Sequence, residues 1–268
     1  MYVERVQLPS RGFFYGGVLP GGWVEVRPMS TQEESLLLSP RSERVKLLNR
    51  VVDLCLVTRA VPVTNLLSSD RYFLLFVIRN ITFGPHYEYR VKCPSCKSRF
   101  NWKLDIPSGL QLKVLTSEDK EPFEVLLPVL GKKVQLRLLR VSDEEEVARY
   151  VESKPIAGEG DTGHFYRLSR HIVNVDGVKV DSSAALTMCE NMESADSLTI
   201  ERSVEVHDSG LVLTPSYACP KCGEEFERLM PLTDDFFRPR VIAISRSGRQ
   251  EPEGGAKAVT EGKVGAGS

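Results

Sequence analysis

Cys93-Pro94-Ser95-Cys96 and Cys219-Pro220-Lys221-Cys222 are two copies of one C-P-x-C motif, separated by 126 positions. In both copies a phenylalanine stands four residues beyond the second cysteine, as Phe100 and as Phe226. Zinc accepts four thiolates in a tetrahedral arrangement, and a two-residue spacer lets both cysteines of a tight turn point at one ion. The spacing therefore predicts one structural zinc ion bound by four ligands: Cys93, Cys96, Cys219 and Cys222.

A redox-active dithiol is the main alternative for a closely spaced cysteine pair in a reducing compartment. A thioredoxin-like pair should open a helix within a βαβ unit. Here residues 87–91 lead into the first motif and residues 100–104 lead out of it, and both runs alternate in polarity as strands do. We therefore expect a metal site between strands, in which the ion joins two distant halves of the chain.

Length and composition indicate an ordinary soluble globular protein. The 268 residues are 41% apolar, enough to bury a core without disulfides. The chain lacks the roughly 18 consecutive apolar residues of a membrane span, and residues 1–9 lack the apolar core of a signal peptide. The formal net charge of −1 gives no overall attraction to nucleic acid or to an anionic membrane. We therefore expect a protein of the reducing cytoplasm without a membrane partner.

The beginning of the chain predicts an extended arm followed by a strand. Residues 1–22 contain many turn formers, including Gly16, Gly17 and Pro20, so an ordered helix is not expected there. Residues 23–27 partly alternate in polarity, which is typical of a short strand. Both strand and arm precede the first predicted helix.

Three helices are expected between this strand and the first cysteine motif. Ser30 and Glu33 have the spacing of a capping box at the start of the first helix. Apolar residues at three- and four-residue steps predict a second helix over about 42–59, in which Cys55 is a small core residue. Asp70 is expected to cap a third helix that ends before Gly84.

The same order of signals returns after residue 110 and predicts an internal repeat. The run Ser142 to Glu145 repeats the capping box 112 positions after Ser30. Asp196 and Gly210 stand 126 positions after Asp70 and Gly84, as the second cysteine motif does after the first. The difference between the two offsets predicts an insertion in the second half, for which the glycine-rich run 152–163 is the candidate.

The fold class that follows is α+β, with two related lobes from an internal duplication. Each lobe would contain a strand, helices and one zinc knuckle, and the four cysteines would form a zinc-ribbon-like site between them. The expected boundaries are an N-terminal arm over 1–22, a first lobe over 23–110 and a second lobe over 111–240. Residues 241–268 are dominated by Gly, Glu, Lys, Ala and Ser and are expected to be disordered.

The other sequence motifs do not indicate an enzyme. Residues 158–163 match GxGxxG, but this run follows a helical pattern and contains acids that would repel a phosphate. The four histidines, at positions 86, 164, 171 and 207, have no spacing typical of a triad or of a zinc hydrolase, and we expect them on the surface or in loops. The adjacent acids Asp234 and Asp235 are expected to cap a helix or to face solvent in a turn.

The first cysteine motif is flanked by basic residues with Phe100 and Trp102 interleaved, a pattern that can bind single-stranded nucleic acid. The same positive charge can offset the formal −2 charge of a four-thiolate zinc site. The second motif carries Glu224 and Glu225 instead and is not basic. A zinc-ribbon nucleic-acid adaptor is therefore the alternative function and not the favoured one.

Several short signals, taken in order, resemble the baseplate hub assembly family of T-even-like contractile-tail phages. The resemblance covers about residues 6–240, and none of its motifs is catalytic. The residues that carry it are Leu8 to Gly12, Tyr15, Ser30 to Glu34, Asp70 to Arg79, Thr82 to Gly84, Tyr87, the two C-P-x-C motifs, Cys222-Gly-x-x-Phe226 and Phe236-Phe237.

The resemblance implies a non-enzymatic virus protein, either a structural component or an assembly factor of the baseplate hub. Its partners would be other phage tail and hub proteins, with the tape-measure protein and a second copy of the chain as open candidates. It would act in host cytoplasm during assembly, and its presence in the finished tail is left open. Exposed aromatics at positions 13–15 and 236–237 are the candidate contact residues, with packing onto their own lobe as the alternative.

Overall fold

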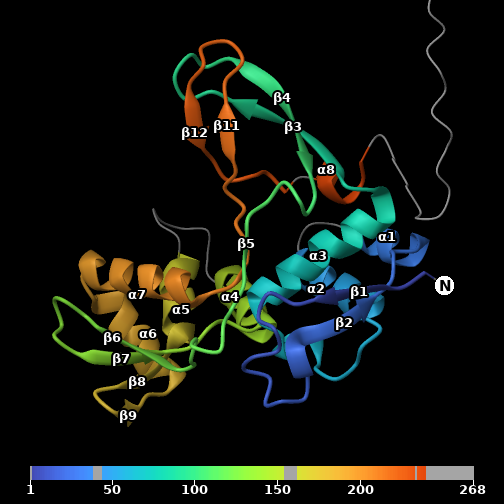
Figure 1. The fold of residues 1–268 in the computed structure, drawn as a ribbon. Coiled ribbons are helices and arrows are strands. Elements are labelled where there is room, and N and C mark those ends of the chain that lie inside the picture. The colour runs from blue at the N-terminus through green and yellow to red at the C-terminus, as the bar shows by residue number, and fades with distance from the viewer. Residues whose placement is uncertain (1, 39–43, 154–161, 233, 240–268) are drawn as a thin grey trace, which may run out of the picture.

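The computed structural model describes residues 2–38, 44–153, 162–232 and 234–239. It has three parts: two bodies built of helices and small sheets, and a pair of β-hairpins that projects away from both (Figure 1). Most of the predicted glycine-rich insertion, and the tail predicted from residue 241, lie outside the described residues. No helix in the described ranges is long and apolar enough to span a membrane. The architecture is mixed α+β, as predicted.

The first body combines one antiparallel hairpin with three helices. Its elements are β1 (Glu4–Gln7), η1 (Pro20–Gly22), β2 (Trp23–Val26), α1 (Thr31–Leu37), α2 (Arg44–Cys55), η3 (Val63–Asn65) and α3 (Ser68–Phe83). The predicted capping box of Ser30 and Glu33 is present, and α3 ends before Gly84 as predicted. The segment expected to be an arm begins with a strand, because β1 pairs along its length with β2.

The second body contains a four-stranded antiparallel sheet and four helices. The sheet order is β6-β7-β8-β9. A tight turn joins β8 and β9, with Asp176 and Gly177 both at positive φ. The elements are β6 (Phe123–Leu126), β7 (Lys133–Leu136), α4 (Val141–Ser153), α5 (Thr162–His171), β8 (Ile172–Val175), β9 (Val178–Lys179), α6 (Ser182–Asn191) and α7 (Ser194–His207).

Two hairpins form the projecting part, and each contains one C-P-x-C motif in its turn. The first consists of β3 (His86–Lys92) and β4 (Arg99–Asp105), and the second of β11 (Ser216–Ala218) and β12 (Glu225–Glu227). At their base β5 (Leu112–Lys113) pairs with β10 (Gly210–Leu211), and the short helix α8 (Asp234–Phe237) lies beside α3 (Figure 1). The distant segments 86–105 and 216–227 thus leave the bodies together.

The strand pair β1–β2 of the first body and the pair β6–β7 of the second have the same arrangement of neighbours. Glu4 pairs with Val26 in the first, and Phe123 pairs with Leu136 in the second. In each body the second strand then pairs with the residue that follows a helix, Leu56 after α2 and Ile172 after α5. The two chain segments therefore enter and leave their helices along equivalent paths.

An arginine and a buried acid hold the start of the next helix in both bodies. Arg27 binds Glu33 at 2.7 Å, and Arg137 binds Asp143 at 2.6 Å. The hydrogen bond from Arg27 lowers the pKa of Glu33 to about 2. Burial raises the pKa of Asp143, but the hydrogen bond and charge of Arg137 outweigh it, so the net pKa lies below its ordinary value. Both carboxylates are thus held ionised.

The second capping box was predicted at the wrong register. Helix α4 begins at Val141, and the carboxylate that reaches back to an N–H group is Asp143, which accepts from the backbone of Arg140 at 2.8 Å. Its partner arginine at position 137 was not part of the predicted box. The residue whose N–H binds the helix carboxylate, as Ser30 N binds Glu33, is therefore Arg140, 110 positions after Ser30 rather than 112.

The predicted cap residue Asp70 has a different role. Leu67 is the N-cap of α3, whereas the buried Asp70 accepts hydrogen bonds from Ser10 N at 3.0 Å and from Tyr15 Oη at 2.6 Å. In the second body, the buried Asp196 accepts from the backbone N–H groups of residues 129 and 130 at 2.8 and 3.1 Å. Each acid thus fixes the loop of its hairpin to the first turn of α3 or α7.

The two bodies contact each other directly, away from the cysteines. Backbone N–H groups of Ser68 and Val141 donate to Leu139 O and Leu66 O at 3.0 and 2.9 Å. Arg71, which is buried, forms an ion pair with Glu144 of α4. The relative position of the bodies therefore has support other than the cysteine cluster, which was not expected from the sequence.

The aromatic residues proposed as partner contacts are mostly inside the protein. Tyr15 and Phe237 are buried, and Phe236 is 0% exposed and packs against Phe76 with ring centroids 4.8 Å apart. Phe13 and Phe14 are partly buried against the same core. Residues 13–15 therefore pack onto their own part of the chain, whereas Phe236 of the expected second lobe packs onto Phe76 of the first, which neither alternative foresaw. Cys55 is also fully buried, as predicted for a core residue.

Candidate metal centre

Each C-P-x-C motif forms a tight turn at the end of its hairpin. Cys93 N donates to Ser98 O, and Cys219 N donates to Glu224 O, both at 2.9 Å. The residue after the second cysteine has positive φ in both turns, 60° at Lys97 and 75° at Gly223. The matching backbone explains how both turns present two sulfur atoms toward the same point.

The four cysteines that the sequence predicts as ligands of one ion lie close together in the structure. Cys93 Sγ lies 3.7 Å from Cys222 Sγ, and Cys96 Sγ lies 3.7 Å from Cys219 Sγ. All four sulfur atoms lie within 4.8 Å of one another. A tetrahedral site with Zn–S bonds of about 2.3 Å has S–S edges of ~3.8 Å. The cluster is therefore compatible with a metal site made by one cysteine pair from each hairpin.

A serine hydroxyl contacts sulfur atoms from both hairpins. Ser98 Oγ lies 3.0 Å from Cys96 Sγ and 3.4 Å from Cys219 Sγ. Its hydrogen bonds lower the pKa of Cys96, and they lower that of Cys219 to about 6. At Cys222 the backbone N–H of Glu224 lowers the pKa, but burial and the neighbouring sulfurs outweigh it and raise the pKa to about 12. Four close thiols therefore cannot all ionise without a cation to offset their charge.

Aromatic side chains on the inner faces hold the two hairpins together. Tyr89 and Tyr217 lie within hydrogen-bond distance through their hydroxyls, at 2.8 Å, and both are buried. The ring of Trp102 packs edge-on against Tyr217, with centroids 5.2 Å apart. The ring centroid of Phe100 lies 6.5 Å from that of Trp102, and Phe100 is also partly buried against the core. The two aromatics interleaved with the basic residues therefore pack between the hairpins, where they cannot stack freely on bases.

A buried arginine fixes the base of the projection. Arg79 is 0% exposed and donates to backbone carbonyls of Gly84, His86 and Phe236, the last two at 2.6 and 3.1 Å. Burial lowers its pKa to about 10. Tyr87 Oη also donates to Pro231 O at 2.6 Å. The side chain of Arg79 thus connects α3 to the start of β3 and to α8.

Sequence reasoning did not single out Arg79, although a signal exists. It is a cation that directly follows the apolar run 73–78 of α3, on a helix whose neighbours are buried. A buried arginine needs acceptors. Its acceptors come from segments 5 to 157 positions away, which a single sequence cannot reveal.

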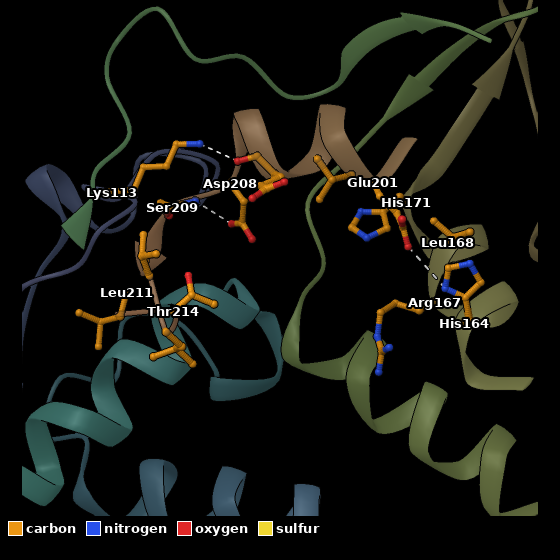
Figure 2. A pocket seen from close by; sticks show the side chains of 15 residues that line it. Lys113, His164, Arg167, Leu168, His171, Glu201, Asp208, Ser209, Leu211 and Thr214 are labelled. Carbon is orange, nitrogen blue, oxygen red and sulfur yellow. Dashed lines mark hydrogen bonds and ion pairs between the residues drawn. The ribbon is translucent and has the colours of Figure 1, made fainter. Parts of the chain in front are cut away.

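A cavity of about 600 Å³ lies between α5, α7 and the segment that follows α7 (Figure 2). Several of its charged side chains are engaged with the protein itself. Lys113 Nζ donates to the carbonyls of Glu205 and Val206, at 2.6 and 2.5 Å, at the C-terminal end of α7 where the helix dipole favours a cation. His164 lies 3.5 Å from a carboxylate oxygen of Glu201. These contacts stabilise the ends and surfaces of helices.

The prediction that all four histidines lie on the surface or in loops is wrong for His171. This residue is the last of α5 and is buried, with Nδ1 2.8 Å from Arg137 O. Burial lowers its pKa to about 4. His207 stacks on Phe123 with ring centroids 4.0 Å apart. Both rings therefore serve the packing of the second body.

Comparison with known proteins identifies the family. Neither the curated proteins nor the solved structures gave a match. A family model described as T4 bacteriophage base plate protein matches residues 13–238. That range contains both cysteine turns, the helices of both bodies and α8. The chain therefore belongs to the T4 bacteriophage base plate protein family, and this membership implies a structural role in a phage baseplate.

Proposed function

We propose that this protein is a non-enzymatic structural component or assembly factor of the central hub of a contractile-tail baseplate. The observation that carries the proposal is the family match over residues 13–238. The contacts described above support it, because the buried charged residues join loops, helices and hairpins to one another. Such a set of contacts suits a rigid scaffold that acts through protein–protein contacts.

Its partners would be other tail and hub proteins, including the tape-measure protein, during assembly in the host cytoplasm. A phage that lacks this chain should form no complete tails, and electron microscopy of lysates is the direct test. Normal tails in the null mutant would contradict an assembly role. Mass spectrometry of purified tails then separates the two forms of the proposal, since a structural component is retained and an assembly factor is not.

The amino-terminal segment is a poor target for deletion in such a test. Strand β1 pairs with β2, and Tyr15 Oη donates to Asp70 and accepts from Leu67 N. Removing residues 1–16 would therefore take away part of the first body as well as any contact surface. Exposed residues of β1 and β2 are better probes. We expect Trp23→Ala, at a side chain 44% exposed, to keep the fold and to report on partner binding alone.

The ion in the cysteine cluster would be a structural zinc held by Cys93, Cys96, Cys219 and Cys222. Support comes from the chemistry of four thiolates and from S–S distances of 3.7 Å between the hairpins. When bound, zinc would offset the thiolate charge and fix the two turns. The protein supplies both turns, the hydroxyl of Ser98 and the aromatic packing between the hairpins.

Mass spectrometry of metals in purified protein tests this assignment. We expect about one zinc per chain, and Cys93→Ser or Cys219→Ser should abolish stoichiometric binding because each removes one of four ligands. Cys55→Ser and Cys189→Ser are matched controls, since both cysteines are buried in the bodies and lie outside the cluster. Full zinc retention in either ligand variant would exclude one shared four-cysteine site.

An internal duplication would account for the likeness of the two bodies. Support comes from the shared hairpin register, the paired arginine–acid contacts and the loop-binding acids at positions 70 and 196. The strand β1 then belongs to the first repeat and not to a separate arm. The repeats would begin near residues 4 and 123, with the remaining boundaries close to those expected from the sequence.

A further inference from the structure

The outer face of the first hairpin is basic on balance, with four cations against the two acids Glu88 and Asp105. Side chains of β3 and β4 alternate, so that Tyr87, Tyr89 and Val91 point inward and are buried while their neighbours are exposed. The cross-strand pairs on the exposed face include Lys92 with Arg99, nearest the cysteines. The exposed cations of this face are Arg90, Lys92, Arg99 and Lys103, and none of them forms an ion pair within the described part of the chain.

The outer face of the second hairpin is acidic. Glu225 occupies the place in its hairpin that Arg99 occupies in the first, each opening the strand after the metal turn. Its cross-strand neighbour is Ala218, where the first hairpin has Lys92. The exposed acids are Glu224, Glu225 and Glu227, with Lys221 as the one basic residue within the turn.

The two charged faces lie on opposite sides of the projection. The hairpins pack through their inner faces, where Tyr89 and Trp102 meet Tyr217, so their exposed faces point away from each other. Figure 1 shows both hairpins beyond the bodies, where a second molecule can reach them. One copy of the chain therefore presents a cationic face on the longer hairpin, with strands of seven residues, and an anionic face on the shorter hairpin, with strands of three residues.

We propose that copies of this protein associate head to tail through these projections, with the basic β3–β4 face of one copy against the acidic β11–β12 face of the next. A contact between two different faces is heterologous, and it generates a ring when the rotation between copies closes. A second copy is the occupant because both of the complementary charged faces are on this chain, next to the metal turns of two like hairpins. The proposal goes beyond the hub role and does not depend on it.

Charge reversal on each face provides the test, using the full metal-loaded chain. The acidic variant carries Arg90→Glu and Arg99→Glu, and the basic variant carries Glu225→Arg and Glu227→Arg. In the acidic variant the two new glutamates offset Lys92 and Lys103, and in the basic variant the two new arginines outweigh Glu224, so neither variant keeps two faces of opposite charge. All four side chains are exposed, so zinc content and circular dichroism should match those of the unaltered protein.

Sedimentation equilibrium measures the association. The unaltered protein should associate with increasing concentration, and the association should weaken when salt rises from about 0.05 M to about 0.5 M, because exposed charges are screened. Each variant alone should associate at least roughly tenfold more weakly, and an equimolar mixture of the two should associate again, as mixed pairs only. A control that reverses Lys120 and Lys132, both exposed on the second half outside the projection, should behave as the unaltered protein.

Two outcomes would overturn the proposal. One is a protein that stays monomeric at every concentration and a variant mixture that does not associate. The other is salt-dependent binding of single-stranded nucleic acid that is lost in the acidic variant while the variant mixture stays monomeric, which would assign the basic face to nucleic acid instead.

Discussion

At the residue scale, the turns of the metal centre need one residue in the left-handed region. Gly223 satisfies this without strain, whereas Lys97 adopts the same backbone conformation with a side chain. A Cβ added at Gly223 would meet nothing within 4 Å, so its cost would come from the backbone alone.

This geometry predicts the effects of two substitutions at one site. We expect Gly223→Ala to lower the free energy of unfolding by about 1 kcal/mol, because an L-residue is strained at positive φ. Gly223→Asn should cost less, since asparagine tolerates this region. Urea unfolding of the metal-loaded protein measures both. Equal losses for the two variants would show that backbone conformation is not the cause.

His171 predicts a pH dependence of stability. Burial holds its pKa at about 4 in the folded protein, below the ordinary value of 6.5. The unfolded chain therefore binds a proton that the folded chain excludes as pH falls through 6.5, and stability decreases between pH 6.5 and about 4. The linked loss is about 3 kcal/mol at most.

Other acids also titrate in the same range, so the measurement is a comparison with a variant. His171→Asn keeps a donor for Arg137 O but has no titratable ring. The difference in unfolding free energy between the unaltered protein and this variant should shift in favour of the variant as pH falls from 7 to 4. A difference that stays constant over this range would contradict the assignment.

At the scale of elements, the sequence pattern predicted those helices and strands that interactions between nearby residues determine. Helices α1, α2 and α3 follow from the capping box and from apolar periodicity, and strands β3 and β4 follow from alternation. Strand β1 has the sequence Glu-Arg-Val-Gln with one apolar residue, and it is a strand because β2 pairs with it. Its existence depends on a contact across about 20 positions, which periodicity does not report.

In the candidate metal site, too, some features were predictable from local sequence and others depend on distant contacts. The grouping of the four cysteines was predictable, since spacing and local sequence match in both turns. The inward direction of Trp102, and the placing of the two charged faces on opposite sides, depend on how the hairpins pack. Asp70 illustrates the same limit, because its partners Ser10 and Tyr15 lie 60 and 55 positions away.

The joint between α3, β3 and α8 gives a prediction for Arg79. Arg79→Met removes the donor from three carbonyls and should lower the free energy of unfolding by about 3 kcal/mol, with loss of amide protection around α8. Arg79→Lys should have an unfolding free energy between those of the unaltered protein and Arg79→Met, because an ammonium keeps the charge but lacks the planar fork of donors. As a control, Arg50→Met removes an exposed ion pair and should change stability by less than about 0.5 kcal/mol.

At the scale of the molecule, the two bodies and the projection are held together by different interactions. The bodies meet through backbone hydrogen bonds at residues 66–68 and 139–141 and through the ion pair of Arg71 with Glu144. The hairpins meet through aromatic packing and the cysteine cluster. The sequence led us to expect that the metal joins the two halves, and the direct contacts between the bodies add a second connection.

Removal of the proposed zinc should therefore disorder the projection and leave the bodies in place. After chelation we expect hydrogen exchange to rise at β3, β4, β11 and β12, because four adjacent thiols without a cation no longer fix the two turns. Amides at the interface between the bodies, such as Ser68 and Val141, should keep their protection, because their acceptors Leu139 O and Leu66 O do not involve the cysteines. Restored protection on adding zinc back would exclude irreversible damage as the cause. Loss of protection at Ser68 and Val141 together with the hairpins would mean that the metal holds the whole molecule together after all.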